Sequence, residues 1–398
     1  MCDTFCVRRP DRMLFAKNSD RPPNEAQVVE AHDRRAAAAD TGARTLRTQY
    51  LTLPDPGAAA VVVSRPTWLR GAEHGINEHR VAVGNEKIWT VDDPRAAPPA
   101  LLGMDLVALV LERAHDADEG LSVLTALLEE YGQGGSGEAD RDEPYYSSFL
   151  IADPHRAWIV ETSNRRFAAR PARAGDAISN RVTIGTDWTV ASSDVAPGTD
   201  IDTWRSPRIP TGIADGRLAA TRACVTAATT ARELVATLRH HGGNDAGGKS
   251  WGAPGSPPGE VAPLPTAIGD DFSGITVCMH TRGLDTTTAS MVCELPVDPD
   301  EPVRAWFALG SPCASVYVPT FPPFVAPELA RPDQWQRFAA LRGRVERDPA
   351  ALAEVRHELA PVEAALWDEA DSCAASARAA FAVQAFAPVD AALARLGV

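Results

Sequence analysis

The chain has 398 residues, of which 44% are hydrophobic, so it can form one large domain or two ordinary ones with a substantial core. Its formal net charge of −14 would repel a nucleic-acid backbone or an anionic membrane surface, so we expect neither as a partner. The seven cysteines show no paired spacing, which favours a reducing compartment over a disulfide framework. We recognise no secretory leader and no apolar run near the roughly 18 residues that span a membrane, so we predict a cytoplasmic protein.

The first two residues carry the main chemical signal. If methionine aminopeptidase removes Met1, as the small side chain of Cys2 allows, Cys2 becomes the terminal residue. It then holds a thiol, with an ordinary pKa of about 8.5, and an α-amine, with an ordinary pKa of about 7.7–8.0. The amine can accept the thiol proton directly or through one water, so a single residue supplies nucleophile and base. Position alone leaves the alternative that Cys2 is a small apolar filler.

The residues after Cys2 predict a hairpin. Two apolar runs, 2–7 and 13–16, are separated by a turn at 9–12, and pairing them would bring Lys17 and Asp20 beside Cys2. A cation near a thiol favours the thiolate, and a carboxylate can hold an ammonium terminus. The alternative for Lys17 and Asp20 is a surface ion pair worth under about 1 kcal/mol.

The chain up to residue 180 alternates predicted strands with one helical region. The polar segment 21–40 predicts a loop or irregular edge, 75–78 a turn, and the Gly- and acid-rich stretch between 128 and 144 a solvated, mobile loop. Helical spacing of apolar residues predicts helices at 101–114 and 122–131. Strand patterns occur at 47–53, 58–64, 81–85, 147–153, 157–162, 166–172 and 177–180.

The second half of the chain predicts more helix. Residues 215–240 are helical, and the basic residues before Gly242 are typical of a helix C-terminus. A Gly/Pro-rich insertion at 242–271 precedes strand patterns at 274–280, 289–295 and 305–309. Residues 333–396 predict helices broken at Pro349, Pro361 and Pro388. Meandering strands followed by helices favour antiparallel sheets with helices outside them. We predict a main domain at 1–326 and a helical C-terminal extension at 327–398 packed on it.

A dense polar and aromatic segment between two apolar strands is a candidate substrate wall, and a structural loop is an equal alternative. We name five substrate-binding candidates from this segment and from the residue after Asp20: Arg21, Arg65, Trp68, Glu73 and His74. Because the sequence lacks CxxC, HExxH or clustered His/Asp ligands, we expect no metal and no cofactor. Met104, Cys278 and Met279 are expected in the core. Cys6 shares a strand face with Cys2, which disfavours a disulfide between them.

Several short motifs resemble one family when taken in order. Cys-Asp-Thr-Phe at 2–5 and Lys-Asn-Ser-Asp-Arg at 17–21 open the series, and together the motifs cover roughly residues 2–325. The chain resembles the secernins, of peptidase family C69 in the N-terminal nucleophile (Ntn) hydrolase superfamily. The further motifs lie at 64–73, 75–79, 83–86, 102–107, 131–135, 148–153, 178–180, 277–280 and 287–292.

The resemblance implies a fold and a set of roles. It implies an α+β fold, a four-layer αββα sandwich of antiparallel sheets with the nucleophile at the open end of one sheet. Cys2 would be the nucleophile, Asp20 would orient the terminus, and Lys17, where related acylases carry arginine, would tune the thiolate. Asn85 and Asn180 match positions that stabilise the oxyanion; without the resemblance either could equally cap a turn. A second arginine of the acylases has no clear counterpart, and Arg282 is the candidate for it.

These roles imply a cysteine-dependent Ntn amidohydrolase that cleaves a small amide or dipeptide through a thioester acyl-enzyme. An acyltransferase would use the same nucleophile if an amine outcompeted water. A second alternative is a non-catalytic, secernin-like regulatory protein that keeps the fold. The sequence leaves open whether the chain forms a homo-oligomer.

Overall fold

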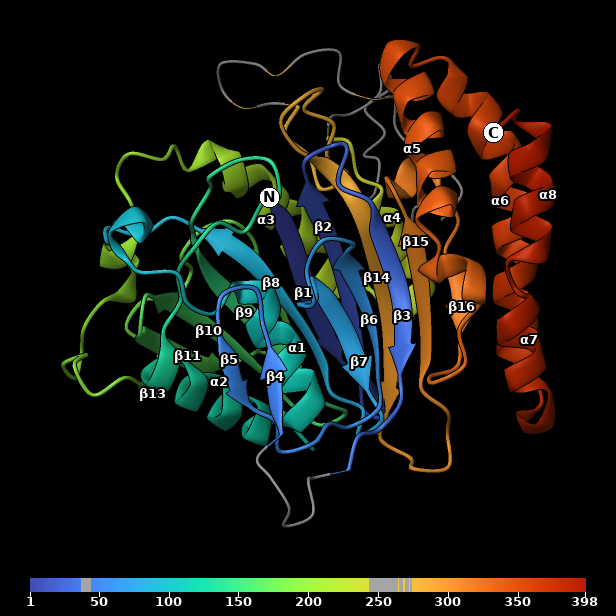
Figure 1. The fold of residues 1–398 in the computed structure, drawn as a ribbon. Coiled ribbons are helices and arrows are strands. Elements are labelled where there is room, and N and C mark those ends of the chain that lie inside the picture. The colour runs from blue at the N-terminus through green and yellow to red at the C-terminus, as the bar shows by residue number, and fades with distance from the viewer. Residues whose placement is uncertain (37–43, 243–263, 265–267, 269–271, 273) are drawn as a thin grey trace.

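The computed structural model describes residues 1–36, 44–242, 264, 268, 272 and 274–398, and these form two antiparallel sheets with helices on their outer sides (Figure 1). Most of the predicted insertion at 242–271 lies outside the described residues. Within the described part, none of the helices is both long and apolar enough to cross a bilayer.

The first sheet is built around the N-terminal hairpin. Strands β1 (Cys2–Arg8) and β2 (Arg12–Arg21) pair antiparallel, with Cys2 opposite Ser19 and Thr4 opposite Lys17, so the predicted hairpin is confirmed. The strand order is β12-β1-β2-β14-β15-β16. The remaining strands are β12 (Gly175–Ile178), β14 (Thr286–Pro296), β15 (Arg304–Leu309) and β16 (Val318–Thr320).

The second sheet has eight strands in the order β13-β11-β10-β9-β8-β7-β6-β3. Its strands are β3 (Gln27–His32), β6 (Val61–Pro66), β7 (His74–Asn77), β8 (Ala82–Ile88), β9 (Tyr146–Ala152), β10 (Ala157–Ser163), β11 (Arg166–Pro171) and β13 (Val190–Ala191). A separate two-stranded ribbon consists of β4 (Thr45–Arg47) and β5 (Thr52–Pro54).

Four local predictions in these regions are wrong. The predicted loop at 21–40 contains β3, which forms the edge of the second sheet beside β6. The predicted turn at 75–78 is largely β7, and the predicted strand at 47–53 is split between β4 and β5. Residues 274–280 are irregular, with one bridge from His280 to Thr286. Pairing across a sheet, which local patterns do not report, decides the first three of these cases.

Side chains alternate between the two faces of each strand, and this alternation produces the layers of the fold. On β1, Cys6 faces the other sheet, while Phe5 and Val7 face helices α3 (Gly212–Ala227) and α4 (Ala231–Leu238). On the second sheet, Val83 and Phe149 pack against α1 (Gly103–Arg113) and α2 (Ala117–Tyr131). Each sheet therefore buries both faces, and the four-layer αββα sandwich is confirmed (Figure 1).

The C-terminal helices stand together at one side of the sandwich (Figure 1). They are α5 (Pro332–Arg347), α6 (Ala351–Ser372), α7 (Arg378–Gln384) and α8 (Ala387–Arg395). Helix α5 packs against β3 and β15, and α6 packs against β16. Helices are interrupted at Pro349 and just before Pro388, which lies in the first turn of α8, as predicted, whereas Pro361 lies inside α6 and does not break it. Short 3-10 helices are η1 (Pro94–Ala96), η2 (Ile201–Trp204), η3 (Pro312–Ala314), η4 (Pro327–Ala330) and η5 (Ala375–Ala377).

Candidate functional site

Cys2 begins β1 and lies beneath Met1, with only 5% of its surface exposed. Its Sγ accepts a hydrogen bond from the backbone N–H of Asp20 at 3.4 Å. Burial raises the pKa of the Cys2 thiol to about 11, against the opposing effects of Lys17 and the N-terminal ammonium. With Met1 attached, the thiol is therefore neutral at pH 7.

The backbone nitrogen of Cys2 is held by a buried amide. Cys2 N–H donates to Asn180 Oδ1 at 2.8 Å, and the Nδ2 of Asn180 donates to the carbonyl of Lys87 at 2.7 Å. The oxygen of Asn180 faces the terminus, and an oxygen cannot stabilise an oxyanion. This orientation points to positioning of the terminal nitrogen, in place of the oxyanion role expected for Asn180.

Asp20 lies on the neighbouring strand, also buried. Its Oδ1 accepts a hydrogen bond from Thr287 Oγ1 at 2.6 Å, and its Oδ2 has no hydrogen-bond partner among the described residues. Burial raises the pKa of Asp20 to about 7, although the N-terminal ammonium and Arg217 oppose this. The Met1 ammonium reaches only the backbone carbonyl of Asp20, at 3.0 Å. Asp20 Oδ2 lies 3.9 Å from Arg217 Nη1, so the carboxylate forms an ion pair with Arg217 although this oxygen accepts no hydrogen bond.

Lys17 supplies a buried positive charge. Its Nζ donates to the backbone carbonyl of Asn85 at 2.6 Å and lies 3.7 Å from Glu86 Oε1. Burial alone would lower the pKa of Lys17, but the ionised forms of Cys2, Glu86 and the neighbouring carboxylates raise it above its ordinary value. Lys17 therefore stays protonated and favours a thiolate at Cys2.

Asn85 reaches this group through its backbone. Its side chain lies toward α1, where Nδ2 is within 3.5 Å of Ser147 Oγ and a Cβ added at Gly103 would come within 2.5 Å of it. Asn85 Oδ1 is buried without a hydrogen-bond partner in the described part of the chain. The structure thus places Asn85 beside Lys17, and its side chain forms no hydrogen bond with Cys2.

Arg217 is a residue at this site that was not predicted from the sequence. From α3, its guanidinium donates to the carbonyl of Cys2 at 3.0 Å, to Asp3 Oδ2 at 2.7 Å and to Asn180 Oδ1 at 2.6 Å. Arg282, the sequence candidate for a second arginine, is instead exposed in the turn before β14. A signal for Arg217 existed, because it shares the buried stripe of α3 with Ala214, Leu218, Thr221 and Val225.

Three of the predicted wall residues lie near the end of β2. Arg21 is buried and pairs with Glu25 at 2.6 Å and Glu73 at 3.5 Å. It also donates to the carbonyl of Gly137 at 2.6 Å, so the loop predicted as solvated and mobile packs inward at that residue. His74 Nδ1 lies 3.0 Å from Ser19 Oγ, and burial together with Lys17 lowers its pKa well below the ordinary value.

The other two wall residues point elsewhere. Arg65 forms a bidentate pair with Glu30, with both N–O distances 2.8 Å, and donates to the Leu69 carbonyl at 3.0 Å. Trp68 packs against Leu69 and Met104. Arg65 and Trp68 line a separate cavity of about 310 Å³ to which Cys2 does not contribute. Their contacts therefore favour the structural-loop alternative for this part of the segment.

The ammonium group of Met1 forms an ion pair with a further acidic residue, Asp285. Met1 N lies 3.1 Å from Asp285 Oδ2, and the other oxygen of Asp285 pairs with Arg141 at 3.3 Å. Burial would raise the pKa of Asp285, but the terminus, Lys87 and Arg141 lower it below its ordinary value. An ionised carboxylate thus faces the position that Met1 occupies in front of Cys2.

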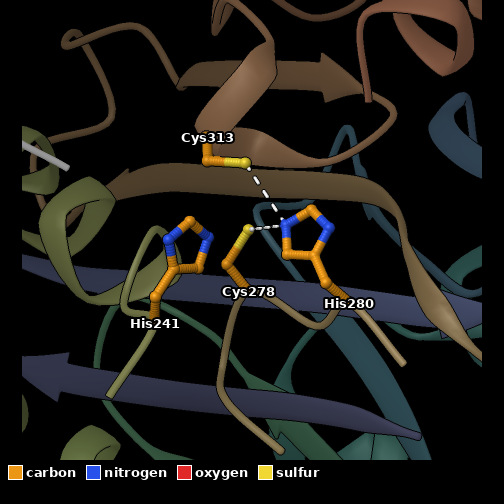
Figure 2. A group of neighbouring side chains, drawn as sticks. All are labelled: His241, Cys278, His280 and Cys313. Atoms are coloured by element: carbon orange, nitrogen blue, oxygen red, sulfur yellow. Dashed lines mark hydrogen bonds between the residues drawn. The ribbon is translucent and has the colours of Figure 1, made fainter. Parts of the chain in front are cut away.

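The expectation that the chain lacks clustered metal-ligating side chains is wrong. Four buried residues from three separate segments come together in the fold: His241, Cys278, His280 and Cys313 (Figure 2). His241 was expected to be an ordinary basic residue at a helix end, but it lies in the interior. Sequence spacing does not reveal the group because the fold, not a local motif, assembles it.

Comparisons with known proteins found no matching family model. Among solved structures, penicillin V acylase from Agrobacterium tumefaciens is 12% identical, with 83% of this chain and 88% of that chain covered and a TM-score of 0.41. A variant of conjugated bile acid hydrolase from Clostridium perfringens is 10% identical, covering 76% and 88%, with a TM-score of 0.38. A Caenorhabditis elegans ortholog of N-acylethanolamine-hydrolyzing acid amidase is 7% identical, covering 46% and 71%, with a TM-score of 0.29. At these identities and TM-scores the similarity assigns no activity to this chain.

Proposed function

We propose that this chain, once Met1 is removed, is a cysteine-dependent Ntn hydrolase of small amides, with dipeptides as its substrate class. One observation carries the proposal: the backbone nitrogen of Cys2 is fixed 2.8 Å from Asn180 Oδ1, inside a buried polar network. A cysteine that serves only as filler does not need its nitrogen held by a buried amide and its carbonyl held by a buried guanidinium. The secernin-like assignment and a cytoplasmic location remain predictions from the sequence.

The reaction follows from an α-amine and a thiol on one residue. The amine takes the thiol proton, and the Cys2 thiolate attacks the substrate carbonyl, forming a C–S bond and moving the carbonyl electron pair onto oxygen. The resulting ammonium protonates the leaving nitrogen as the C–N bond breaks, leaving a thioester. Water, deprotonated by the free amine, then attacks the thioester and releases the acid and the thiol.

The buried charges fit this sequence of proton transfers. Lys17 favours the thiolate, while Asp20 Oδ2 and Asn180 Oδ1 provide two acceptors for the ammonium that forms on Cys2. Arg217 fixes Asn180 from the opposite side at 2.6 Å. Asn85 remains our candidate on the oxyanion side, because its Nδ2 is held only by a long contact of 3.5 Å.

The contacts of Met1 favour a substrate with a free α-ammonium. In the precursor, the ammonium of Met1 pairs with Asp285 at 3.1 Å directly in front of Cys2. Removal of Met1 frees that carboxylate at the position where a substrate would enter. A dipeptide carries an α-ammonium that Asp285 could bind, whereas an N-acylated amide does not.

A substrate screen tests the proposal. Processed protein, with loss of Met1 verified by intact mass, is incubated with dipeptides and with N-acyl amino acids. We expect dipeptide hydrolysis by the wild type, none by Cys2→Ala, and most of the activity in Cys6→Ala, a matched control for a buried thiol on the same strand.

A labelling experiment separates the alternatives. A small thiol-reactive electrophile should give one fast adduct that maps to Cys2. No turnover together with no preferential labelling of Cys2 would favour the non-catalytic regulatory protein. Products in which an added amine carries the acyl group, with little free acid, would make the chain an acyltransferase.

A further inference from the structure

Two histidines and two cysteines lie together beside the first sheet, outside the group around Cys2. Their ligand atoms all lie within 4.8 Å of one another, and all four residues are buried (Figure 2). His280 Nε2 is 3.5 Å from Cys278 Sγ and 3.3 Å from Cys313 Sγ. The histidine rings of 241 and 280 have centroids 5.2 Å apart in an edge arrangement.

These distances match a tetrahedral metal site. Zinc binds thiolate sulfur at about 2.3 Å and imidazole nitrogen at about 2.0–2.1 Å, which places neighbouring ligand atoms roughly 3.3–3.8 Å apart. Both sulfur–nitrogen distances at His280 fall in that range. The widest pair, at up to 4.8 Å, must close by about 1 Å to match it. Two thiolates and two imidazoles form a donor set that favours zinc.

An acidic partner stands behind one of the histidines. His280 Nδ1, the ring nitrogen that faces away from the sulfurs, lies 2.9 Å from Glu346 Oε1 in α5. A metal-binding histidine usually donates its second ring nitrogen to a carboxylate, which fixes the ring and makes the first nitrogen a better ligand. A pair of buried thiols that merely packs in the core does not require this arrangement.

We propose that His241, Cys278, His280 and Cys313 bind one Zn²⁺ as a structural site. All four positions of a tetrahedron are supplied by protein side chains, so no position stays open for water or substrate. The ligands come from the chain after α4, from the segment before β14 and from η3, and Glu346 adds α5. The ion would therefore fix both ends of the chain between residues 241 and 278 and tie the C-terminal helices to the sandwich.

Hydrogen bonds also connect the ligand segments to β2 and to Asp20, beside Cys2. Asn18 Nδ2 donates to the carbonyls of Leu238 and Val277, both at 2.8 Å, so β2 is bound on either side of the ligand segments. Met279, between two ligands, receives a hydrogen bond from Thr286 Oγ1 and donates to Thr287 Oγ1. Thr287 in turn donates to Asp20. The ion would thus stabilise the backbone that places Asp20, without taking part in the reaction.

Metal analysis of the wild-type protein tests the proposal directly. Protein expressed with added zinc and purified without chelator should contain one zinc per chain by elemental mass spectrometry. Cobalt exchanged into the same site should give the thiolate charge-transfer and strong visible bands of tetrahedral Co²⁺. Metal-free wild-type protein, iron or copper in place of zinc, or a Cys278–Cys313 disulfide in a peptide map would each overturn the proposal.

Variants separate this site from the rest of the fold. Cys313→Ala should lose the bound zinc, whereas Cys293→Ala, which removes another fully buried thiol from the core, should retain it. Glu346→Gln should keep one zinc but release it to a competing chelator about 10–100-fold more readily. Zinc retained by Cys313→Ala at wild-type stoichiometry and affinity would overturn the assignment. Activity enters none of these readouts, so they are independent of the proposed function.

Discussion

Asn180 Oδ1 lies 2.8 Å from the backbone nitrogen of Cys2 and 2.6 Å from Arg217 Nη2, so one buried oxygen joins the candidate nucleophile to a guanidinium. The same oxygen can accept a hydrogen bond from the α-amine that Met1 removal creates. Asn180 was predicted to lie at the site, and the contact of its oxygen with Cys2 favours a role in holding the terminal amine.

Replacing Asn180 should therefore affect the direction of the terminal amine. Asn180→Leu keeps the size of the side chain but removes the acceptor, and we expect kcat for a dipeptide to fall about 10²-fold, as for other small displacements of reacting groups. Asn180→Asp keeps an acceptor and should retain more activity. Steady-state kinetics on processed protein measures both, and a wild-type kcat in the leucine variant would limit Asn180 to a packing role.

Arg217 and Asp3 form a buried pair at 2.7 Å, with neither side chain exposed. Removing one partner leaves an unpaired buried charge, so Arg217→Leu should lower the free energy of unfolding by about 3–5 kcal/mol. In Arg217→Leu the unpaired charge is the Asp3 carboxylate, which Asp3→Asn removes. The double variant Asp3→Asn/Arg217→Leu should therefore recover part of the lost free energy of unfolding. Urea unfolding measures the three variants. Additive losses in the double variant would show that the two side chains do not interact.

Glu86 gives a pH dependence with a definite sign. It is fully buried, contacts Thr4 Oγ1, and burial raises its pKa from an ordinary 4.5 to about 7. Between these two values the folded state binds a proton that the unfolded state has released. The free energy of unfolding from this group therefore falls as pH rises through that window, by at most about 1.4 kcal/mol per pH unit.

The variant Glu86→Gln isolates that contribution. Its free energy of unfolding minus that of the wild type should increase from pH 5 to about pH 7 and stay constant above about pH 8. Taking the difference removes the opposite contribution of His74, which is buried neutral and lowers stability at acid pH in both proteins. Denaturant unfolding across this range gives the difference, and a value independent of pH would contradict the assignment.

Local sequence patterns could predict the hairpin of β1 and β2 and the helices α1 and α2, because each is defined by contacts close in the chain. They could not predict β3 as a strand, since this short run within a polar segment becomes regular only by pairing with β6 at the sheet edge. The irregular backbone at 274–280 also depends on contacts outside the segment. Its polar groups bond to Thr286 and Thr287 and to the end of α4 in place of a strand ladder.

The candidate site also contains some residues that local sequence patterns could predict and others that they could not. Cys2, Lys17 and Asp20 could be predicted because one hairpin brings them together. Arg217 could not be assigned a partner, because only the packing of α3 on β1 brings it within 2.7 Å of Asp3. The four residues of the proposed zinc site come from three separate segments, so no spacing in the sequence marks them as a group.

Asp285 provides a test of substrate class. If it binds the α-ammonium of a dipeptide, Asp285→Asn should lower kcat/KM for dipeptides about tenfold or more, the effect expected for losing a charged hydrogen bond. The same variant should act normally on the N-acetylated form of that dipeptide, if the wild type accepts it. Kinetics with the two substrates makes the comparison, and equal losses on both would assign Asp285 to the structure of the turn.

The N-terminal position of Cys2 can be tested by adding one residue in front of it. A Leu inserted between Met1 and Cys2 should block processing, because the residue after Met1 is then bulky. The thiol stays in the chain, but its α-nitrogen remains an amide with essentially no basicity, and the added residues occupy the place where Met1 meets Asp285. A general base contributes about 10²–10⁴-fold, and blocked access adds to its loss, so activity should fall below detection.

The melting temperature should change little, because the insertion lies outside the buried layers. A fusion with a cleavable tag that leaves Cys2 first provides the control and should restore activity. Intact-mass measurement confirms each terminus before the assay. If the Leu-extended protein still hydrolyses its substrate at the wild-type rate, the α-amine of Cys2 is not the base. The sandwich, which rests on strand pairing and core packing, would be unaffected by that result.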